Sequence, residues 1–156
     1  MRTAVLVIGC AIGALVLAVL LVPEGEVATL STYTADGRPH ETQVWVVEGD
    51  AVPGEPDGAV FLRAHSRFAE WLHRLEASPQ VELARRGEAR AYRAEVPDPA
   101  PLREPVNRAM AAKYGVADRL LGFVLDADIS VPVRLVPDPT RENAAREKSE
   151  GHAAPQ

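Results

Sequence analysis

Hydrophobic and polar positions divide the chain into two parts. Residues 4–22 are apolar without a break, whereas from residue 26 onward apolar positions alternate with polar ones or recur at helical spacing. At about 1.5 Å per residue, the first run is nearly as long as the ~30 Å hydrocarbon core of a bilayer is thick. The pattern predicts one N-terminal transmembrane helix, a membrane anchor over residues 1–23, followed by a single small domain over residues 24–137.

Three other interpretations of the apolar run stay open. A cleaved signal peptide has a shorter apolar region and small residues before the cut, which residues 26–28 supply poorly. A lipoprotein would be acylated at Cys10, although most of the apolar run follows this cysteine. A buried core helix is the third alternative, but such a helix is rarely so uniformly apolar. Arg2 precedes the run and Glu24 and Glu26 follow it. The positive-inside rule therefore slightly favours a single-pass membrane protein whose domain lies outside the cytoplasm.

Six short segments of the domain have the composition or the alternation of β-strands: 26–33, 40–48, 59–64, 80–85, 88–96 and 129–136. Asp36-Gly37 and Arg86-Gly87 separate neighbouring segments and predict tight turns, so these neighbours should pair as antiparallel hairpins. A small antiparallel sheet with this many strands hides its edges by closing. We therefore expect a mainly β fold, a six-stranded antiparallel barrel with helices packed outside. Pro132 inside the last strand indicates an edge position or a bulge.

The first helical segment follows the third strand. Ser66 is suited to cap a helix over residues 67–77, which Ser78-Pro79 ends. Four large apolar side chains share one face of this helix and should pack inward, with Trp71 in the core: Phe68, Trp71, Leu72 and Leu75.

A second helix is expected over residues 102–114, after a linker at 97–101, and Gly115 is suited to end it. Residues 116–125 are predicted to form a short helix or turn. The polar and charged tail, residues 138–156, is expected to be mostly disordered.

Composition narrows the chemistry. The net charge is −5 and no cluster of Lys and Arg is long enough for a nucleic-acid surface, so we expect no nucleic-acid partner. The only cysteine, Cys10, lies inside the apolar run, which excludes an intrachain disulfide and a cysteine metal site. The four histidines lack the spacing of metal ligands, and we predict no metal.

Two stretches of the domain carry a family pattern: VATLSTYTADGRPHETQVWVVEGD and GAVFLRAHSRFAEWLHRLEASPQVELARRGEARAYRAEV. They resemble the flavin-binding split β-barrel, the pyridoxamine-phosphate-oxidase-like superfamily, over about residues 26–136. Lys113-Tyr114-Gly115 brings the chain nearer to the deazaflavin-dependent nitroreductase-like branch. The resemblance implies a homodimer that binds a flavin or deazaflavin, such as FMN, at the subunit interface.

The resemblance also implies where the cofactor's phosphate binds, near the third strand and the following helix. The matching positions are Arg63, His65, Ser66 and Arg67. A helix N-terminus with a hydroxyl and flanking guanidinium groups is independently suited to an anion. A capped helix with two solvated arginines remains the structural alternative.

The second strand supplies the ring pocket in that family, and Gln43, Val44 and Trp45 match it here. Gln43 and Trp45 share one face of the strand and Val44 the other. A flat ring needs an apolar wall with a few polar partners, although Trp45 is also a plausible core residue. Tyr114 is the candidate donor to a substrate, with a structural role at the helix end as the alternative.

We expect a membrane-tethered homodimeric oxidoreductase that uses a flavin or deazaflavin to reduce a small organic acceptor, because in such enzymes the cofactor supplies the chemistry. No catalytic residue is assigned. The alternative is a non-catalytic module that binds a flavin, heme or lipid, or only dimerises. Glu70 departs from the family pattern beside the expected phosphate site and favours this alternative. Residues 49–58 and 116–125 are where specificity would be set.

Overall fold

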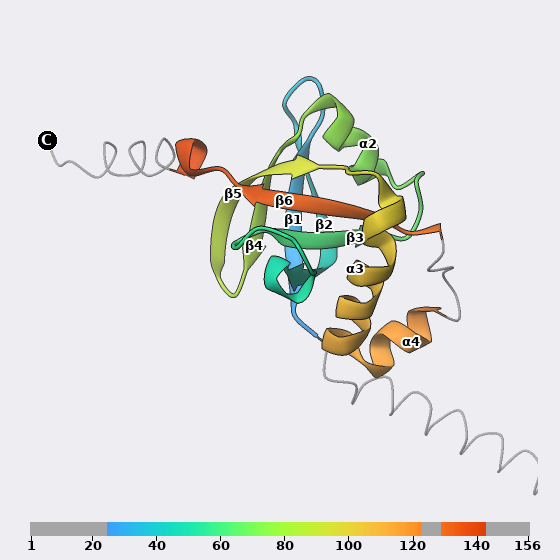
Figure 1. Cartoon of the computed structure of the whole chain (residues 1–156). Coiled ribbons are helices and arrows are strands. Elements are labelled where there is room, and N and C mark those ends of the chain that lie inside the picture. The colour runs from blue at the N-terminus through green and yellow to red at the C-terminus, as the bar shows by residue number, and fades with distance from the viewer. Residues whose placement is uncertain (1–24, 123–128, 143–156) are drawn as a thin grey trace, which may run out of the picture.

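The computed structural model describes residues 25–122 and 129–142 (Figure 1). Six antiparallel strands close into one barrel in the order β1-β2-β3-β6-β5-β4. The closed barrel confirms the mainly β fold expected from the alternating segments. The strands are β1 Val27–Tyr33, β2 Pro39–Glu48, β3 Val60–Ala64, β4 Gln80–Arg85, β5 Glu88–Glu95 and β6 Val131–Pro137.

Two tight turns set the register of the barrel. Gly37 has a φ of 79° in the turn between β1 and β2, and Arg86 and Gly87 have φ values of 51° and 82° between β4 and β5. Between β4 and β5 both central residues have positive φ, which matches the twist of a two-residue hairpin, and glycine adopts positive φ without steric cost. Thr29 consequently pairs with Gln43 on one side of β1 and with Ala84 on the other.

Pro132 occupies a local edge inside the closed barrel. It pairs with Arg63 of β3, but the pairing of β6 with β5 begins only at Arg134 opposite Glu95. The side of β6 that faces β5 is therefore unpaired at Pro132, where a proline costs no ladder hydrogen bond. Of the two placements that the sequence indicates, an edge position or a bulge, this arrangement corresponds to a local edge.

The helix α2, Glu70–Ala77, closes one end of the barrel with apolar side chains. Trp71, Leu72 and Leu75 are buried and belong to the same hydrophobic cluster as the inward-facing strand residues. Burying each such side chain contributes about 1.5–3 kcal/mol. Arg74 of this helix donates from Nε to Thr32 Oγ1 at 2.8 Å, which joins α2 to the end of β1.

The opposite end of the barrel holds an ionic cluster. Glu26, Glu48 and Arg85 each lie two residues along the chain from an inward-facing core residue, so they share its side of the sheet. Arg85 Nε lies 2.9 Å from Glu26 Oε1, and Arg85 Nη1 lies 3.1 Å from Glu48 Oε2. Lys113 Nζ contacts Glu26 Oε2 at 2.8 Å and Glu48 Oε1 at 3.7 Å.

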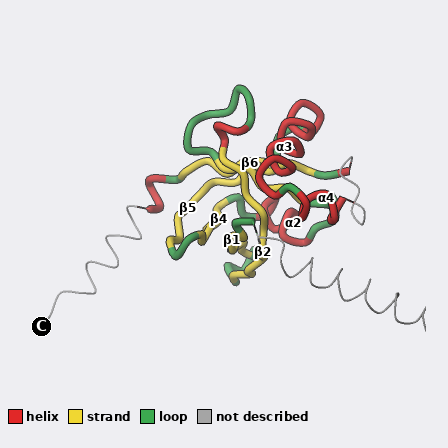
Figure 2. The backbone as a smooth tube through the Cα atoms, turned by 90° about the horizontal axis from the view of Figure 1, so that it is seen from below, coloured by secondary structure: helices red, strands yellow, loops and turns green. Residues whose placement is uncertain are grey.

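Two helices lie outside the strands on one side of the molecule (Figure 2), and a short 3-10 turn follows β2. α3 runs over Pro99–Tyr114, η1 over Gly49–Ala51 and α4 over Val116–Gly122. Asp98 caps α3 by accepting from the Ala100 amide at 3.0 Å. Apolar residues of α3 pack on the outer face of β2 and β3, where Val47 and Phe61 are buried, and form a second hydrophobic cluster.

Three sequence-based expectations for the helices need correction. The first helix begins at Glu70 rather than at residue 67, with Ala69 as its N-cap and no side-chain cap hydrogen bond. Phe68 therefore lies before the helix and is 75% exposed instead of facing the core. The second helix begins at Pro99, because Asp98 and Pro99 start it within the expected linker.

Gly115 does end α3, with a φ of 54°, and α4 occupies part of the stretch where a short helix or turn was expected. β6 ends at Pro137, and in the tail residues 139–142 form a helical turn. The predicted anchor at residues 1–23, and the tail from residue 143, lie outside the described residues. Among the described residues, no helix has the length and apolar character needed to cross a membrane.

Candidate functional site

Most of the predicted cofactor residues line one pocket beside the start of α2. We call it the barrel-side pocket, and its volume is about 370 Å³. β2 and β3 carry most of the lining, and the loop after β3 and α2 complete it. The lining residues are Gln43, Val44, Trp45, Arg63, His65, Ser66, Ala69 and Trp71.

Strand alternation positions the β2 residues. Val44 is buried with the barrel interior, whereas Gln43 is exposed and Trp45 half-buried on the outer side. Gln43 Nε2 donates to Thr29 Oγ1 at 3.0 Å. One face of the Trp45 ring stacks on Tyr114, with centroids 4.4 Å apart and planes 7° apart. The opposed faces of β2 that the sequence predicts are confirmed.

Arg63 lines the pocket, but its charge is already compensated. Its guanidinium forms an ion pair with Asp118 of α4 through Nη2, and Nη1 donates to Asn107 Oδ1 of α3 at 3.3 Å. Only 6% of the Arg63 side chain is exposed. A buried arginine held by a carboxylate is a weak anchor for a further anion, because that anion would compete with Asp118. This pairing depends on where the helices lie relative to β3, which the sequence pattern does not specify.

Among the polar residues that line the barrel-side pocket, His65 has the fewest hydrogen bonds and ion pairs to other described residues. It is half-buried just after β3, and no hydrogen bond or ion pair joins its imidazole to any other residue of 25–122 or 129–142. Burial lowers the pKa of His65, the Arg63 charge lowers it further, and Asp118 partly opposes them. These effects favour the neutral imidazole, which has a nitrogen lone pair available to a ligand.

Ser66 and Arg67 do not form the expected phosphate cradle. Ser66 Oγ accepts from the Phe68 amide at 3.1 Å in a turn before α2, so it does not cap the helix. Arg67 does not line the pocket, and its guanidinium lies over the exposed Phe68 ring at 5.7 Å from the centroid. Arg63, Arg67 and the Ser66 hydroxyl are thus separated, because the helix begins later than a Ser66 N-cap would place it.

Tyr114 stacks on Trp45 but does not line this pocket, and its hydroxyl is hydrogen-bonded to the backbone. Its hydroxyl accepts from the Val46 amide at 2.8 Å and lies 2.7 Å from the Glu26 carbonyl and 2.9 Å from the Val46 carbonyl. Burial raises the pKa of Tyr114, with the backbone hydrogen bond opposing. Its expected part as a substrate donor stays a prediction, but these contacts favour the structural alternative.

Sequence reasoning missed three contributors to the site. Ala69 and Trp71 line the pocket because α2 starts late, and Trp71 is at once a core and a pocket residue, as its burial shows. Asp118 was missed because nothing near it in sequence marks its partner, 55 residues away. Among the described residues, no group of His, Cys, Asp and Glu side chains could together hold a metal ion.

Solved structures with the same fold come from several bacteria. A conserved hypothetical protein from Mycobacterium tuberculosis is similar over 73% of this chain and 74% of its own, with 21% identity and a TM-score of 0.52. HutZ, a heme storage protein from Vibrio cholerae, is similar over 74% and 83%, with 18% identity and a TM-score of 0.51. A heme binding protein from Mycobacterium smegmatis is similar over 73% of this chain, with 22% identity and a TM-score of 0.50, and this chain spans about half its length, 47%.

No known family profile and no curated protein matches the chain. At these identities the similarity concerns the fold, and it confirms the split barrel that the sequence resemblance implies.

Proposed function

We propose that the domain binds a flat conjugated cofactor in the barrel-side pocket, and that heme is the first candidate. The observation that carries the proposal is the placement of His65, whose imidazole has no hydrogen bond or ion pair among the described residues, in a pocket that Trp45 and Trp71 also line. Neutral imidazole is a common axial ligand of heme iron, and indole rings offer a flat apolar wall. Two structures of the same fold are named for heme storage and heme binding, which supports the same choice.

The residues present fit heme better than they fit a phosphate-bearing flavin. Arg63 is paired with Asp118, and Arg67 lies outside the pocket, so the charge expected for a flavin phosphate is not gathered there. A pocket of about 370 Å³ is near the lower end of ligand sites, which run to about 1,000 Å³. The pocket therefore matches part of a heme or one flavin ring system. A second copy of the chain, which we propose as the partner in a homodimer, would cover the remainder.

The test is a hemin titration of the full-length chain in detergent, followed by visible absorbance. We expect a Soret band typical of histidine-ligated heme in the wild type. His65→Ala should lose that signature and weaken binding at least tenfold, because it removes the only proposed iron ligand. His73→Ala is the matched control, since His73 is on exposed α2 surface and contacts Glu76 at 3.8 Å. Equal spectra and affinities for wild type and His65→Ala contradict the proposal.

A flavin- or deazaflavin-dependent oxidoreductase is the second candidate, and Arg63 at the pocket wall is the observation that favours it. If the phosphate of FMN displaces Asp118, Asp118→Asn should tighten FMN binding, because it leaves the guanidinium uncompensated. Quenching of FMN and deazaflavin fluorescence by the wild type and by this variant measures the effect. Tight FMN binding that Asp118→Asn leaves unchanged would remove Arg63 as the anchor.

We also propose that residues 4–22 tether the domain to a membrane as a single-pass anchor. The uninterrupted apolar run supports it, and the charges around the run slightly favour a domain outside the cytoplasm. Protease protection in intact spheroplasts tests both statements. Carbonate-extractable protein would contradict the anchor, and a domain that is protected in spheroplasts would contradict the orientation.

A further inference from the structure

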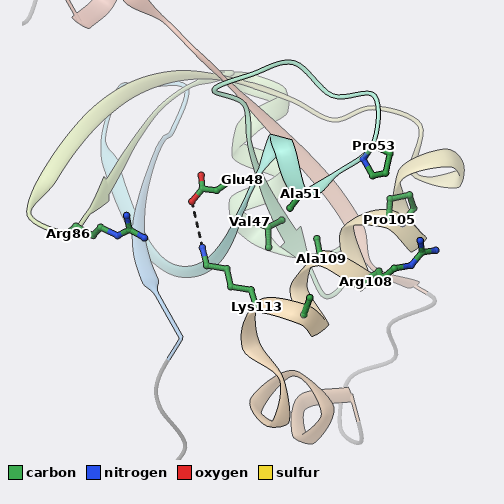
Figure 3. Close-up of a pocket in the computed structure, with 10 residues that line it drawn as sticks. Val47, Glu48, Ala51, Pro53, Arg86, Pro105, Arg108, Ala109 and Lys113 are labelled. Carbon is green, nitrogen blue, oxygen red and sulfur yellow. Dashed lines mark ion pairs between the residues drawn. The ribbon is translucent and has the colours of Figure 1, made fainter.

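A second pocket lies between α3 and the end of β2, away from His65 (Figure 3). We call it the helix-side pocket, and its volume is about 650 Å³, larger than that of the barrel-side pocket. Its floor is formed by small and aliphatic side chains from β2, the loop after it and α3: Val47, Ala51, Pro53, Pro105, Ala109 and Ala112.

The rim of the helix-side pocket is mainly cationic. Arg86, Arg108 and Lys113 line it together with a single carboxylate, Glu48. Lys113 and Glu48 meet at 3.7 Å, and Figure 3 shows Arg86 and Arg108 on either side of them. Within residues 25–122 and 129–142, Arg108 pairs only with the exposed Glu104 on its own helix, an arrangement that competes weakly with another anion. The pocket thus combines an apolar floor with a positive rim, which complements an amphipathic anion.

The rim also lies where the described chain begins. Glu26 Oε2 contacts Lys113 Nζ at 2.8 Å, and Glu26 Oε1 contacts Arg86 Nε at 3.0 Å. Gly25 packs so closely on Tyr114 that a Cβ atom there would lie 2.0 Å from the ring. A membrane span that ends at residue 22 is three residues from Gly25, which is at most about 10 Å of chain. The rim is therefore within reach of the membrane surface that the proposed anchor implies.

We infer that the helix-side pocket binds an anionic membrane lipid, with an acyl chain on the apolar floor and the headgroup phosphate at the cationic rim. The inference rests on the proposed anchor for its source of lipid, and on the pocket's own lining for its chemistry. Acyl chains need an apolar surface without buried polar groups, and the floor residues provide one. Juxtamembrane Lys and Arg attract anionic headgroups. Glu26 already pairs with Arg86 and Lys113. Arg108, whose partner Glu104 is exposed, is therefore the rim cation assigned to the headgroup phosphate.

The experiment uses the full-length chain in nanodiscs that contain phosphatidylglycerol with a diazirine on one acyl chain. After irradiation, cross-linked peptides are identified by mass spectrometry. We expect labelling of peptides around residues 47–53 and 105–112, in addition to labelling within residues 4–22. Phosphatidylcholine with the same acyl chain should label the pocket peptides at least fivefold less, since it has no net negative charge.

Ala112→Trp is the blocking variant, because Ala112 lines the pocket yet is exposed on α3. Ala111→Trp is its matched control, since Ala111 is also exposed on α3 and does not line the pocket. Ala112→Trp should reduce pocket labelling at least fivefold and Ala111→Trp should not, with equal circular dichroism for both. Arg108→Gln should reduce labelling by phosphatidylglycerol and leave labelling by phosphatidylcholine unchanged.

The labelling pattern separates the two proposals. Labelled residues 4–22 with unlabelled pocket peptides overturn the lipid site and leave the anchor standing. Labelled pocket peptides with unlabelled residues 4–22 support the lipid site and overturn the anchor. Absence of both labels overturns both proposals, and equal labelling by the two lipids overturns the preference for an anionic headgroup.

Discussion

The barrel is closed at its two ends by different chemistry. At one end α2 inserts Trp71, Leu72 and Leu75 into the strand interior, and the closure is apolar. At the other end Glu26, Glu48 and Arg85 meet, with Lys113 contributing from α3. Apolar closure depends on buried area, whereas ionic closure depends on paired charges that are costly to leave alone. The barrel-side pocket lies beside the apolar end, and the helix-side pocket shares Glu48 and Lys113 with the ionic one.

The largest expected effect comes from weakening the apolar end. Leu75→Ala removes a side chain that is 4% exposed and leaves a cavity between α2 and the strands. The free energy of unfolding should fall by about 2–5 kcal/mol, measured by urea denaturation. Val116→Ala, at a position that is 55% exposed, is the control and should stay within about 0.5 kcal/mol of the wild type. A loss for Leu75→Ala no larger than the control would mean that α2 does not close the barrel.

A smaller effect should follow from breaking the ionic end. Arg85→Met leaves Glu48 without its closest cation and Glu26 with only Lys113 and Arg86. We expect a loss of about 1–3 kcal/mol, less than for a fully buried pair because Glu48 is partly exposed to water. Arg90→Gln, which breaks an exposed pair with Glu88 on the same hairpin, should cost at most about 0.5 kcal/mol. Equal losses for the two arginine variants would show that the cluster behaves as ordinary surface charge.

Tyr114→Phe tests how α3 is attached at the ionic end. The variant keeps the stack on Trp45 but leaves the Val46 amide without its hydroxyl acceptor. A buried donor without a partner costs about 1–2 kcal/mol, which the same denaturation experiment measures. A stability equal to that of the wild type would mean that the hydroxyl contributes little to holding α3, and would return Tyr114 to consideration as a substrate donor.

The smallest effect, and the one that separates the two ends most sharply, is on pH dependence. Hydrogen bonding by Arg85 lowers the pKa of Glu48, and for Glu26 the effect of burial, which raises the pKa, is outweighed by Lys113, Arg85 and Arg86. Both carboxylates therefore bind protons more readily in the unfolded chain. Their stabilisation is present above their ordinary pKa of 4.5 and is lost as the pH falls through the lower folded values.

Denaturation midpoints at several pH values between 7 and 3 measure this loss. Glu26→Gln should be less stable than the wild type at pH 7, and the difference should shrink as the pH falls. Leu75→Ala should instead lower stability at every pH without changing the shape of the curve, because the apolar end does not titrate. A Glu26→Gln curve parallel to that of the wild type would mean that the Glu26 ion pairs do not stabilise the fold.

Local sequence patterns determined most of the strands and the sides they face. Alternation placed Val44 and Trp45 on opposite faces of their strand, and the glycines at positions 37 and 87 indicated the hairpins, because side-chain direction and positive φ are properties of a few neighbouring residues. The closed barrel followed from the number of short antiparallel strands. Six residues of the barrel-side pocket, from Gln43 to Ser66, were indicated by the resemblance to the split-barrel family rather than by these local patterns.

Tertiary structure decided which charged side chains pair with one another and where α2 begins. Asp118 reaches Arg63 from α4, which packs beside α3, and this pairing removes the free guanidinium that the sequence predicted. The start of α2 at Glu70 turns Ser66 and Arg67 away from a common cradle, and leaves His65 as the pocket's unpaired polar group among the described residues. Glu26 and Lys113 are 87 residues apart in sequence, yet they meet at one end of the barrel. Such pairings depend on how whole elements dock, which the order of residues along one strand or helix does not contain.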